Sequence, residues 1–260
     1  MLDILEKFNW AQKHIKDFES AVDAFRHANR DHVGSNTDEK TGDVTYYIKS
    51  VPEVPNPIRL ILGDAVHNLR STLDYVASAM EVAAGKTPDK YTGFPIFDSA
   101  EGYRDCPPTK IKGLREPCKR TIDRIQPYHR GNGHRLWQLH RLDIQDKHRL
   151  LVAVSFIPTA RTMTPSEREE FEATFLIPGE NRAARTSMPI NSGTQLAMPL
   201  EAGQHLVTVP AKDAHQDMGF AFDVAINEAG VVEKFPALLF LQFAAEEVYR
   251  AVMDLAPCIR

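Results

Sequence analysis

Helix-forming and strand-forming stretches occupy separate parts of this chain of 260 residues. Apolar residues recur every three or four positions in residues 1–30, 57–84, 132–148 and 231–256, with charged residues between them. This spacing predicts amphipathic helices. Residues 150–227 instead contain short β-type runs separated by Pro, Gly and Asn, namely LLVAVSFI, FEATFLI, QHLVTV and GFAFDVAI. Such segregation predicts an α+β fold, because alternating α/β chains interleave strands and helices.

The expected architecture is a helical bundle core with an antiparallel β-sheet inserted before the C-terminal helix. We expect a helical region over 1–148, a β block over 149–228, and a last helix within 229–260 that packs back on the helical region to form one compact domain. The polar turn formers of residues 31–42 predict an exposed loop, and residues 43–51 predict a short strand.

The apolar sides of the helices predict the core. The second helix is expected to begin near Pro57, to end at Gly85, and to bury Leu62, Ala65, Leu69, Leu73, Val76 and Met80. The last helix is expected to have an apolar side formed by Phe235, Leu238, Leu239, Phe243, Val248 and Val252.

Charge and cysteine content exclude several classes of protein. With 31 basic and 35 acidic residues, the net charge of -4 argues against wrapping nucleic acid through a global positive field. The three cysteines form no CxxC pair, which fits a reducing compartment and no structural zinc site. We see no signal-peptide pattern and no apolar run of the ~20 residues that a membrane helix needs. The sequence therefore predicts a cytoplasmic protein without a membrane partner.

The motifs of several large enzyme classes are missing. The sequence has no GxxxxGK[ST], no GxGxxG after a strand, no HExxH and no GxSxG. Kinases, dehydrogenases, zinc proteases and α/β-hydrolases therefore lose their usual support. We expect no cofactor and no metal ion.

A band of polar residues lies opposite the apolar stripe of the second predicted helix. At about 100° per residue, this band contains Asp64, His67, Ser71, Asp74 and Ser78, with Arg70 on its flank. A carboxylate three residues before a histidine points the same way, which suits a metal ion or a proton relay. The alternative is a solvated helix face. Asp and Ser are poor residues within a helix, so propensity alone does not account for them.

Two carboxylates interrupt the apolar arc of the third predicted helix. Leu136, Leu139 and Leu142 define the arc, and Asp143 and Asp146 fall inside it. A carboxylate among core leucines is costly unless it is paired or bound. The pattern predicts either a buried ion pair, such as Asp143 with Arg70, or a catalytic or metal-binding role.

The same helix contains two arginine–histidine pairs. Arg141 and His148 are seven residues apart, and Arg135 and His140 are five apart. Both pairs resemble the Arg-x(4–6)-His spacing of HEPN-type ribonucleases, in which arginine stabilises phosphate charge and histidine acts as acid, base or orienting group. The alternative is a set of solvent-facing side chains near a helix end.

Four segments together resemble a family of bacterial proteins that has no assigned activity. They are LGDAVHNLRSTLDYVA at 62–77, FPIF at 94–97, IQPYH at 125–129 and LDIQDKHRLL at 142–151. The resemblance covers most of the chain up to about residue 155. It implies that one constellation is formed by Asp64, His67, Asn68, Arg70, Asp74, Asp146, Lys147, His148 and Arg149.

These observations leave two functional hypotheses. The first is a non-catalytic module that binds a protein or small ligand, with a structural charged constellation. The second is a metal-independent HEPN-type ribonuclease acting on RNA at a homodimer cleft. The candidate catalytic residues are His148, Arg141, His67 and Asp146, and the candidate ligand-binding residues are Asp64, Asn68, Arg70, Asp74, Asp143 and Arg149.

His148 is the single strongest candidate. It lies at the end of the third predicted helix, where the helix dipole favours a cation and should raise the pKa of the imidazole. Together with Arg149, an imidazolium there would suit a phosphate-bearing ligand. The alternative is a helix cap, in which both side chains satisfy the last carbonyls.

Overall fold

The protein has an α+β fold, as the sequence predicts. The computed structural model describes residues 1–105, 114–149, 154–175, 187–189, 200–214 and 218–259. Its elements are, in chain order, α1 (Leu2–Ala28), β1 (Val33–Thr37), β2 (Val44–Ile48), α2 (Asn56–Ala83), α3 (Ala100–Asp105), α4 (Glu116–Ile125), α5 (His134–Arg149), β3 (Val154–Thr162), α6 (Pro165–Phe175), β4 (Ser187–Pro189), β5 (His205–Val209), η2 (Ala211–Asp213), β6 (Phe220–Glu228), β7 (Val232–Pro236), α7 (Ala237–Leu255) and η3 (Ala256–Cys258).

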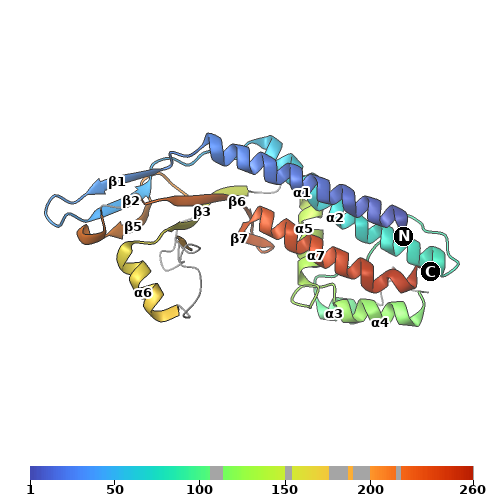
Figure 1. The fold of residues 1–260 in the computed structure, drawn as a ribbon. Coiled ribbons are helices and arrows are strands. Elements are labelled where there is room, and N and C mark those ends of the chain that lie inside the picture. Colours follow the sequence, from blue (N-terminus) through green and yellow to red (C-terminus); the bar gives the residue numbers. More distant parts are fainter. Residues whose placement is uncertain (106–113, 150–153, 176–186, 190–199, 215–217, 260) are drawn as a thin grey trace. The chain divides into compact units, whose positions relative to one another are not determined.

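The chain divides into two compact units rather than the single domain expected from the sequence. Unit 1 comprises 1–22, 55–154 and 226–260, and unit 2 comprises 23–54 and 155–225. The last helix belongs to unit 1 with α2, α4 and α5, as predicted (Figure 1). Residues 23–54 differ from the prediction, since they belong with the β block rather than with the helical region.

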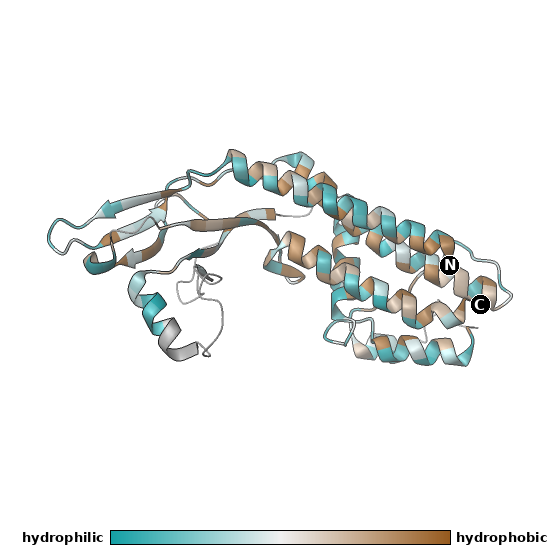
Figure 2. Cartoon of the chain, viewed as in Figure 1, coloured by the Kyte–Doolittle hydropathy of each residue, from teal (hydrophilic) through white to brown (hydrophobic). Residues whose placement is uncertain are grey.

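Unit 1 is built on the contacts of α2 with α5 and α7. All six residues of the predicted α2 stripe are buried, and Leu136, Leu139 and Leu142 of α5 are at most 1% exposed. Apolar residues run along α2 and α7, with hydrophilic residues between them (Figure 2). Helix α2 ends next to Gly85, whose φ of 76° permits the left-handed turn predicted there. The helical periodicity therefore predicted the packing face of α2 and α5 correctly.

The apolar side assigned to the last helix is wrong in part. Leu239 and Phe243 are each 38% exposed, whereas Phe240, Leu241 and Ala244 are fully buried. The helix also begins later than predicted, because Val232–Pro236 form strand β7. α7 starts directly after Pro236. Among the described helices, none is both long enough and apolar enough to cross a lipid bilayer.

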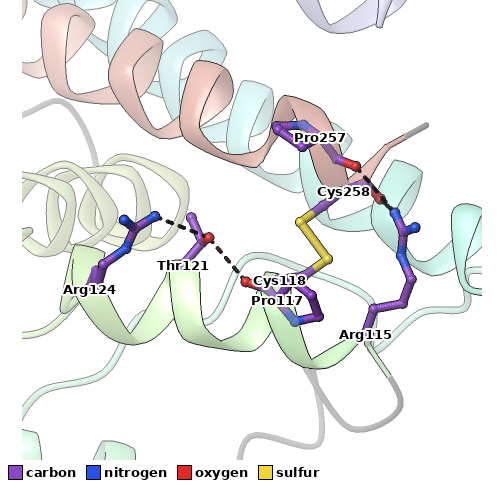
Figure 3. Close-up of a disulfide and its surroundings, with 7 residues drawn as sticks. All are labelled: Arg115, Pro117, Cys118, Thr121, Arg124, Pro257 and Cys258. Carbon is purple, nitrogen blue, oxygen red and sulfur yellow. Dashed lines mark hydrogen bonds between the residues drawn. A yellow bond between two sulfur atoms is a disulfide. The ribbon is translucent and has the colours of Figure 1, made fainter.

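A disulfide joins two distant parts of unit 1. Cys118 on α4 is bonded to Cys258 in η3, 140 residues later in the sequence (Figure 3). Arg115 donates hydrogen bonds from Nη2 to the carbonyls of Pro257 and Cys258 at 3.4 and 2.8 Å, next to this bridge. The third cysteine, Cys106, lies outside the described residues. This pairing was not predicted from the sequence, and disulfides persist mainly in oxidising surroundings.

Unit 2 contains strands of two sheets rather than the single predicted one. The first sheet has the order β1-β2-β5, with both pairs antiparallel, and the second has the order β4-β3-β6-β7. Strand β1 was predicted to be loop, because its sequence VGSNT contains polar turn formers. It forms because it pairs with β2 through a hairpin in which the Asp38 carboxylate accepts hydrogen bonds from the amides of Lys40 and Thr41. Pairing with β2 therefore outweighs the loop-like composition.

The predicted strand FEATFLI is also wrong, since residues 171–175 are the end of helix α6. Thr164 and Glu167 form a reciprocal cap at the start of this helix. The Thr164 hydroxyl accepts from the Glu167 amide at 3.2 Å, and the Glu167 carboxylate accepts from the Thr164 amide at 2.9 Å. This capping box, with Pro165 as the first helical residue, outweighs the β propensity of the apolar residues that follow.

Candidate functional site: the α2–α5 charged cluster

The carboxylate of Asp143 is the buried centre of a charged cluster between α2 and α5. Asp143 is 4% exposed. Its Oδ1 accepts a hydrogen bond from His67 Nδ1 at 2.9 Å, and its Oδ2 accepts one from Lys147 Nζ at 2.7 Å. We call Asp64, His67, Asp143, Asp146 and Lys147 the α2–α5 charged cluster. The prediction of a buried, paired carboxylate is confirmed, but its partners are His67 and Lys147 rather than Arg70.

His67 is the accessible member of the pair, with 45% of its side chain exposed. Because the Asp143 carboxylate only accepts, His67 Nδ1 carries the proton of this hydrogen bond. His67 Nε2 then accepts from the hydroxyl of Ser71 at 3.3 Å. The buried carboxylate therefore fixes the tautomer and the orientation of a half-exposed imidazole.

Asp146 lies against the backbone of α2 at Gly63. A Cβ atom on Gly63 would come within 2.6 Å of Asp146 Oδ1, so a side chain larger than hydrogen would displace the carboxylate. Burial raises the pKa of Asp146, and the nearby carboxylates of Asp143 and Asp64 raise it further. Sequence reasoning did not identify Gly63. Its signal was a glycine within a helix, a position that costs about 1 kcal/mol relative to alanine.

Arg70 forms a second, separate set of contacts. Its side chain is 5% exposed, and its Nη1 donates to Asp74 Oδ1 at 2.6 Å. Nε donates to His140 Nδ1 at 3.1 Å, and Nη2 donates to the carbonyl of Phe94 at 3.4 Å. Asp74 Oδ1 also accepts from the Phe94 amide at 2.9 Å. Arg70 and Asp74 therefore fasten the FPIF segment, in which Phe94 is fully buried, to α2.

Asn68 is buried, and both polar atoms of its side-chain amide form a hydrogen bond. Its Nδ2 donates to the carbonyl of Asp64 at 2.7 Å, and its Oδ1 accepts from Lys7 Nζ of α1 at 2.7 Å. Lys7 was not among the predicted residues, since nothing in its own helix distinguishes it from other exposed lysines. These contacts make Asn68 a link between α1 and α2 within unit 1.

The arginine–histidine pairs are not brought together as pairs. Arg135 lies over the rings of Phe235, Phe240 and Phe243, with its Cζ 5.3–5.5 Å from their centroids, while His140 bonds to Arg70. The side chain of Arg141 is 40% exposed, and its nearest carboxylate, Asp98, is 3.9 Å away. The side chains of His148 and Arg149 lie outside the described part of the structure. The prediction that placed them in the constellation stays a prediction.

Within the described residues, no three His, Cys, Asp or Glu side chains gather into a group that could hold a metal ion. The cluster offers other chemistry. It has one buried, doubly paired carboxylate, one oriented imidazole, and one carboxyl group with a raised pKa.

Comparison with protein-family models, with curated proteins and with solved structures finds no match to this chain.

Proposed function

We propose that the protein is a binding protein of the α+β class in which the α2–α5 charged cluster is structural. The observation that carries this proposal is the saturation of the buried charges. Both carboxylate oxygens of Asp143 accept hydrogen bonds, and three nitrogens of Arg70 donate them. A group whose hydrogen-bonding capacity is used within the protein has little left for a substrate.

The energetics of buried charges support the same proposal. Asp143 and Arg70 are each about 5% exposed, so each would be costly without its partners. Removing the exposed partner, Asp74 for Arg70 or Lys147 for Asp143, leaves a buried charge with one partner fewer, and a fully unpaired buried charge costs about 3–5 kcal/mol. A network of this kind selects one register between α2 and α5.

A second candidate function is metal-independent cleavage of phosphodiester bonds in RNA. The observation that favours it is the oriented, half-exposed imidazole of His67, with Lys147 bound to the same carboxylate. An imidazole held in this way can accept the proton of a ribose hydroxyl, and an ammonium group favours a phosphate. In this function His67 would serve as the base, and the predicted Arg141–His148 pair would act as phosphate-binding groups.

One experiment separates the two functions. Wild type, His67→Ala and His148→Ala are assayed for cleavage of single-stranded RNA in the presence of EDTA, and their thermal unfolding is measured in parallel. The structural function predicts no cleavage by any of the three and a lower Tm for His67→Ala. Cleavage by wild type that is lost in either alanine variant with unchanged Tm would overturn it in favour of the ribonuclease.

The proposal includes a homodimer in the cytoplasm, with RNA or a phosphate-bearing molecule as the partner in the ribonuclease case. The measurements are light scattering during size-exclusion chromatography and salt-dependent binding to RNA. The Cys118–Cys258 pair makes the location testable, because disulfides persist mainly in oxidising surroundings. A thiol count on protein extracted under alkylation tests the location, since a cytoplasmic chain should keep these two cysteines reduced.

A further inference from the structure

A pocket with a volume of about 560 Å³ lies entirely within unit 2, and none of the predicted site residues lines it. Residues from the end of α1, from β1 and β3, and from the start of β6 surround it: Arg26, Asn29, Arg30, Val33, Phe156, Met218, Gly219, Phe220, Ala221 and Phe222. Pockets for small organic ligands typically have volumes of about 300–1,000 Å³ and combine an apolar lining with a few polar groups. The pocket of unit 2 therefore has the size and the lining that a small organic ligand needs.

The apolar wall of this pocket is aromatic and ordered by stacking. The rings of Phe156 and Phe222 stack with centroids 5.1 Å apart and an interplanar angle of 11°. Phe25 packs edge-on against Phe156 at 5.5 Å, which supports it from within unit 2. A flat ring system gains from such a surface, because stacked or edge-to-face aromatic pairs stabilise a complex beyond the burial of apolar area.

The polar side of the pocket is basic. Among the described residues that line it, none is acidic, and two are arginines. Arg26 is already engaged, since Nη2 donates to Asp23 at 2.7 Å and Nη1 lies 3.9 Å from Asp223. Arg30 is exposed and makes no ion pair or side-chain hydrogen bond with any described residue. The guanidinium of Arg30 is therefore the group available to a ligand anion.

A buried histidine packs against the same aromatic wall. The His32 ring is 6% exposed and lies edge-on to Phe156 at 5.2 Å and to Phe222 at 6.0 Å. Its Nδ1 is 3.3 Å from the Ser50 hydroxyl, whereas its Nε2 is buried without a partner among the described residues. These edge-on contacts of His32 add to the aromatic packing that holds Phe156 and Phe222 in place.

We propose that the pocket of unit 2 is a binding site for a planar aromatic carboxylate, with the rings against Phe156 and Phe222 and the carboxylate on Arg30. This inference rests on the proposed binding function and adds the place and the chemical class of the ligand. A carboxylate matches the guanidinium fork in two parallel hydrogen bonds, which are stronger than hydrogen bonds between neutral groups.

The probe is 2-naphthoate, titrated into the full chain by isothermal titration calorimetry. We expect one molecule to bind per chain. We expect 2-naphthalenemethanol, which has the same rings without the charge, to bind at least about tenfold more weakly, since tenfold corresponds to about 1.4 kcal/mol. Acetate, which has the charge without the rings, should give no measurable heat.

Two variants locate the site and one is the control. Arg30→Gln should weaken 2-naphthoate at least about tenfold. Ala221→Trp should abolish binding by filling the pocket, and Ala221 is exposed, so the larger side chain should not disturb the core. Arg120→Gln, at an exposed arginine of α4 in unit 1, should bind as wild type does.

The absence of 2-naphthoate binding up to about 1 mM would overturn the inference. So would an affinity that neither pocket variant changes, or equal affinity for the uncharged alcohol. Circular dichroism confirms that each variant is folded. The RNA-cleavage and unfolding results for the α2–α5 charged cluster do not depend on this titration, so failure of the pocket and failure of the proposed function are distinguishable.

Discussion

The α2–α5 charged cluster of unit 1 and the pocket of unit 2 both involve basic side chains and a histidine. They differ in whether the charged groups are hydrogen-bonded within the protein. In the cluster and the adjacent Arg70 network, the buried carboxylate of Asp143 and the buried guanidinium of Arg70 have all their main hydrogen-bonding positions occupied. In the pocket, Arg30 is exposed, and the neighbouring His32 Nε2 has no partner among the described residues. Charges that are saturated contribute to stability, whereas charges left open beside a cavity are available to a ligand.

Removal of the Cys118–Cys258 disulfide should have the largest effect and should be confined to unit 1. The bond closes a loop of 140 residues, and the loss of such a cross-link costs about 4–5 kcal/mol in the chain-entropy model. In the double variant Cys118→Ser/Cys258→Ser, amide hydrogen exchange should accelerate in α4 and α7 while the strands of unit 2 keep their protection. Equal acceleration in both units would show that they unfold together.

Replacement of Arg70 should have the next largest effect. Arg70→Ala removes a buried guanidinium together with its hydrogen bonds to the half-exposed Asp74 and to the Phe94 carbonyl, so the free energy of unfolding should fall by about 1–3 kcal/mol. Arg120→Ala, at an exposed arginine, should change it by less than about 0.5 kcal/mol. Urea unfolding of the two variants measures the difference. Similar small losses for both would mean that the Arg70 contacts are not structural.

Replacement of Asp146 should raise the stability of the protein, whereas loss of the disulfide or of Arg70 should lower it. Because burial and the neighbouring carboxylates raise its pKa, the folded state binds this proton more tightly than the unfolded state does. Stability should therefore fall as the pH rises from about 4 through the raised pKa. Asp146→Asn should remove this fall and raise the free energy of unfolding at pH 7 by less than about 1 kcal/mol. Urea titrations between about pH 3 and about pH 8 measure it, and a loss of stability in the variant at neutral pH would refute the assignment.

Arg30→Gln should have the smallest effect on stability. Arg30 is exposed and has no ion-pair partner among the described residues, so the free energy of unfolding should change by less than about 0.5 kcal/mol. Differential scanning calorimetry of the variant beside wild type makes the comparison. A large drop in Tm would place Arg30 with the structural charges of the cluster and would remove the contrast between the two regions.

The features predicted correctly from the sequence were those that depend on the residue pattern of a single helix. The 3.6-residue periodicity identified the buried faces of α2 and α5, and a carboxylate inside an apolar arc identified Asp143 as buried and paired. The partners of Asp143 could not be named, because His67 and Arg70 both reach α5 from α2 and periodicity does not resolve which one meets Asp143. His67 bonds to Asp143, whereas Arg70 bonds to His140.

Other features depend on segments that are distant in the sequence. Strand β1 exists because β2 pairs with it, and its own polar residues show no sign of this. Pairing of Cys118 with Cys258 cannot be deduced from three cysteines without the fold. Helix α6 was predictable, since Thr164 and Glu167 have the spacing of a capping box, but the β-type residues after them were given more weight.

The structural role of the buried, hydrogen-bonded charges is tested most directly by two aspartate–lysine pairs that share their spacing and contact distance but differ in burial. Asp143–Lys147 and Asp17–Lys13 are both four residues apart on a helix with a 2.7 Å contact, but the Asp143 side chain is 5% exposed and that of Asp17 is 45% exposed. Urea unfolding of Asp143→Asn and Asp17→Asn compares them. We predict a loss of about 1.5–3 kcal/mol for Asp143→Asn, because His67 and Lys147 lose a charged acceptor, and of less than about 0.5 kcal/mol for Asp17→Asn. Equal losses would contradict a structural role for the α2–α5 charged cluster.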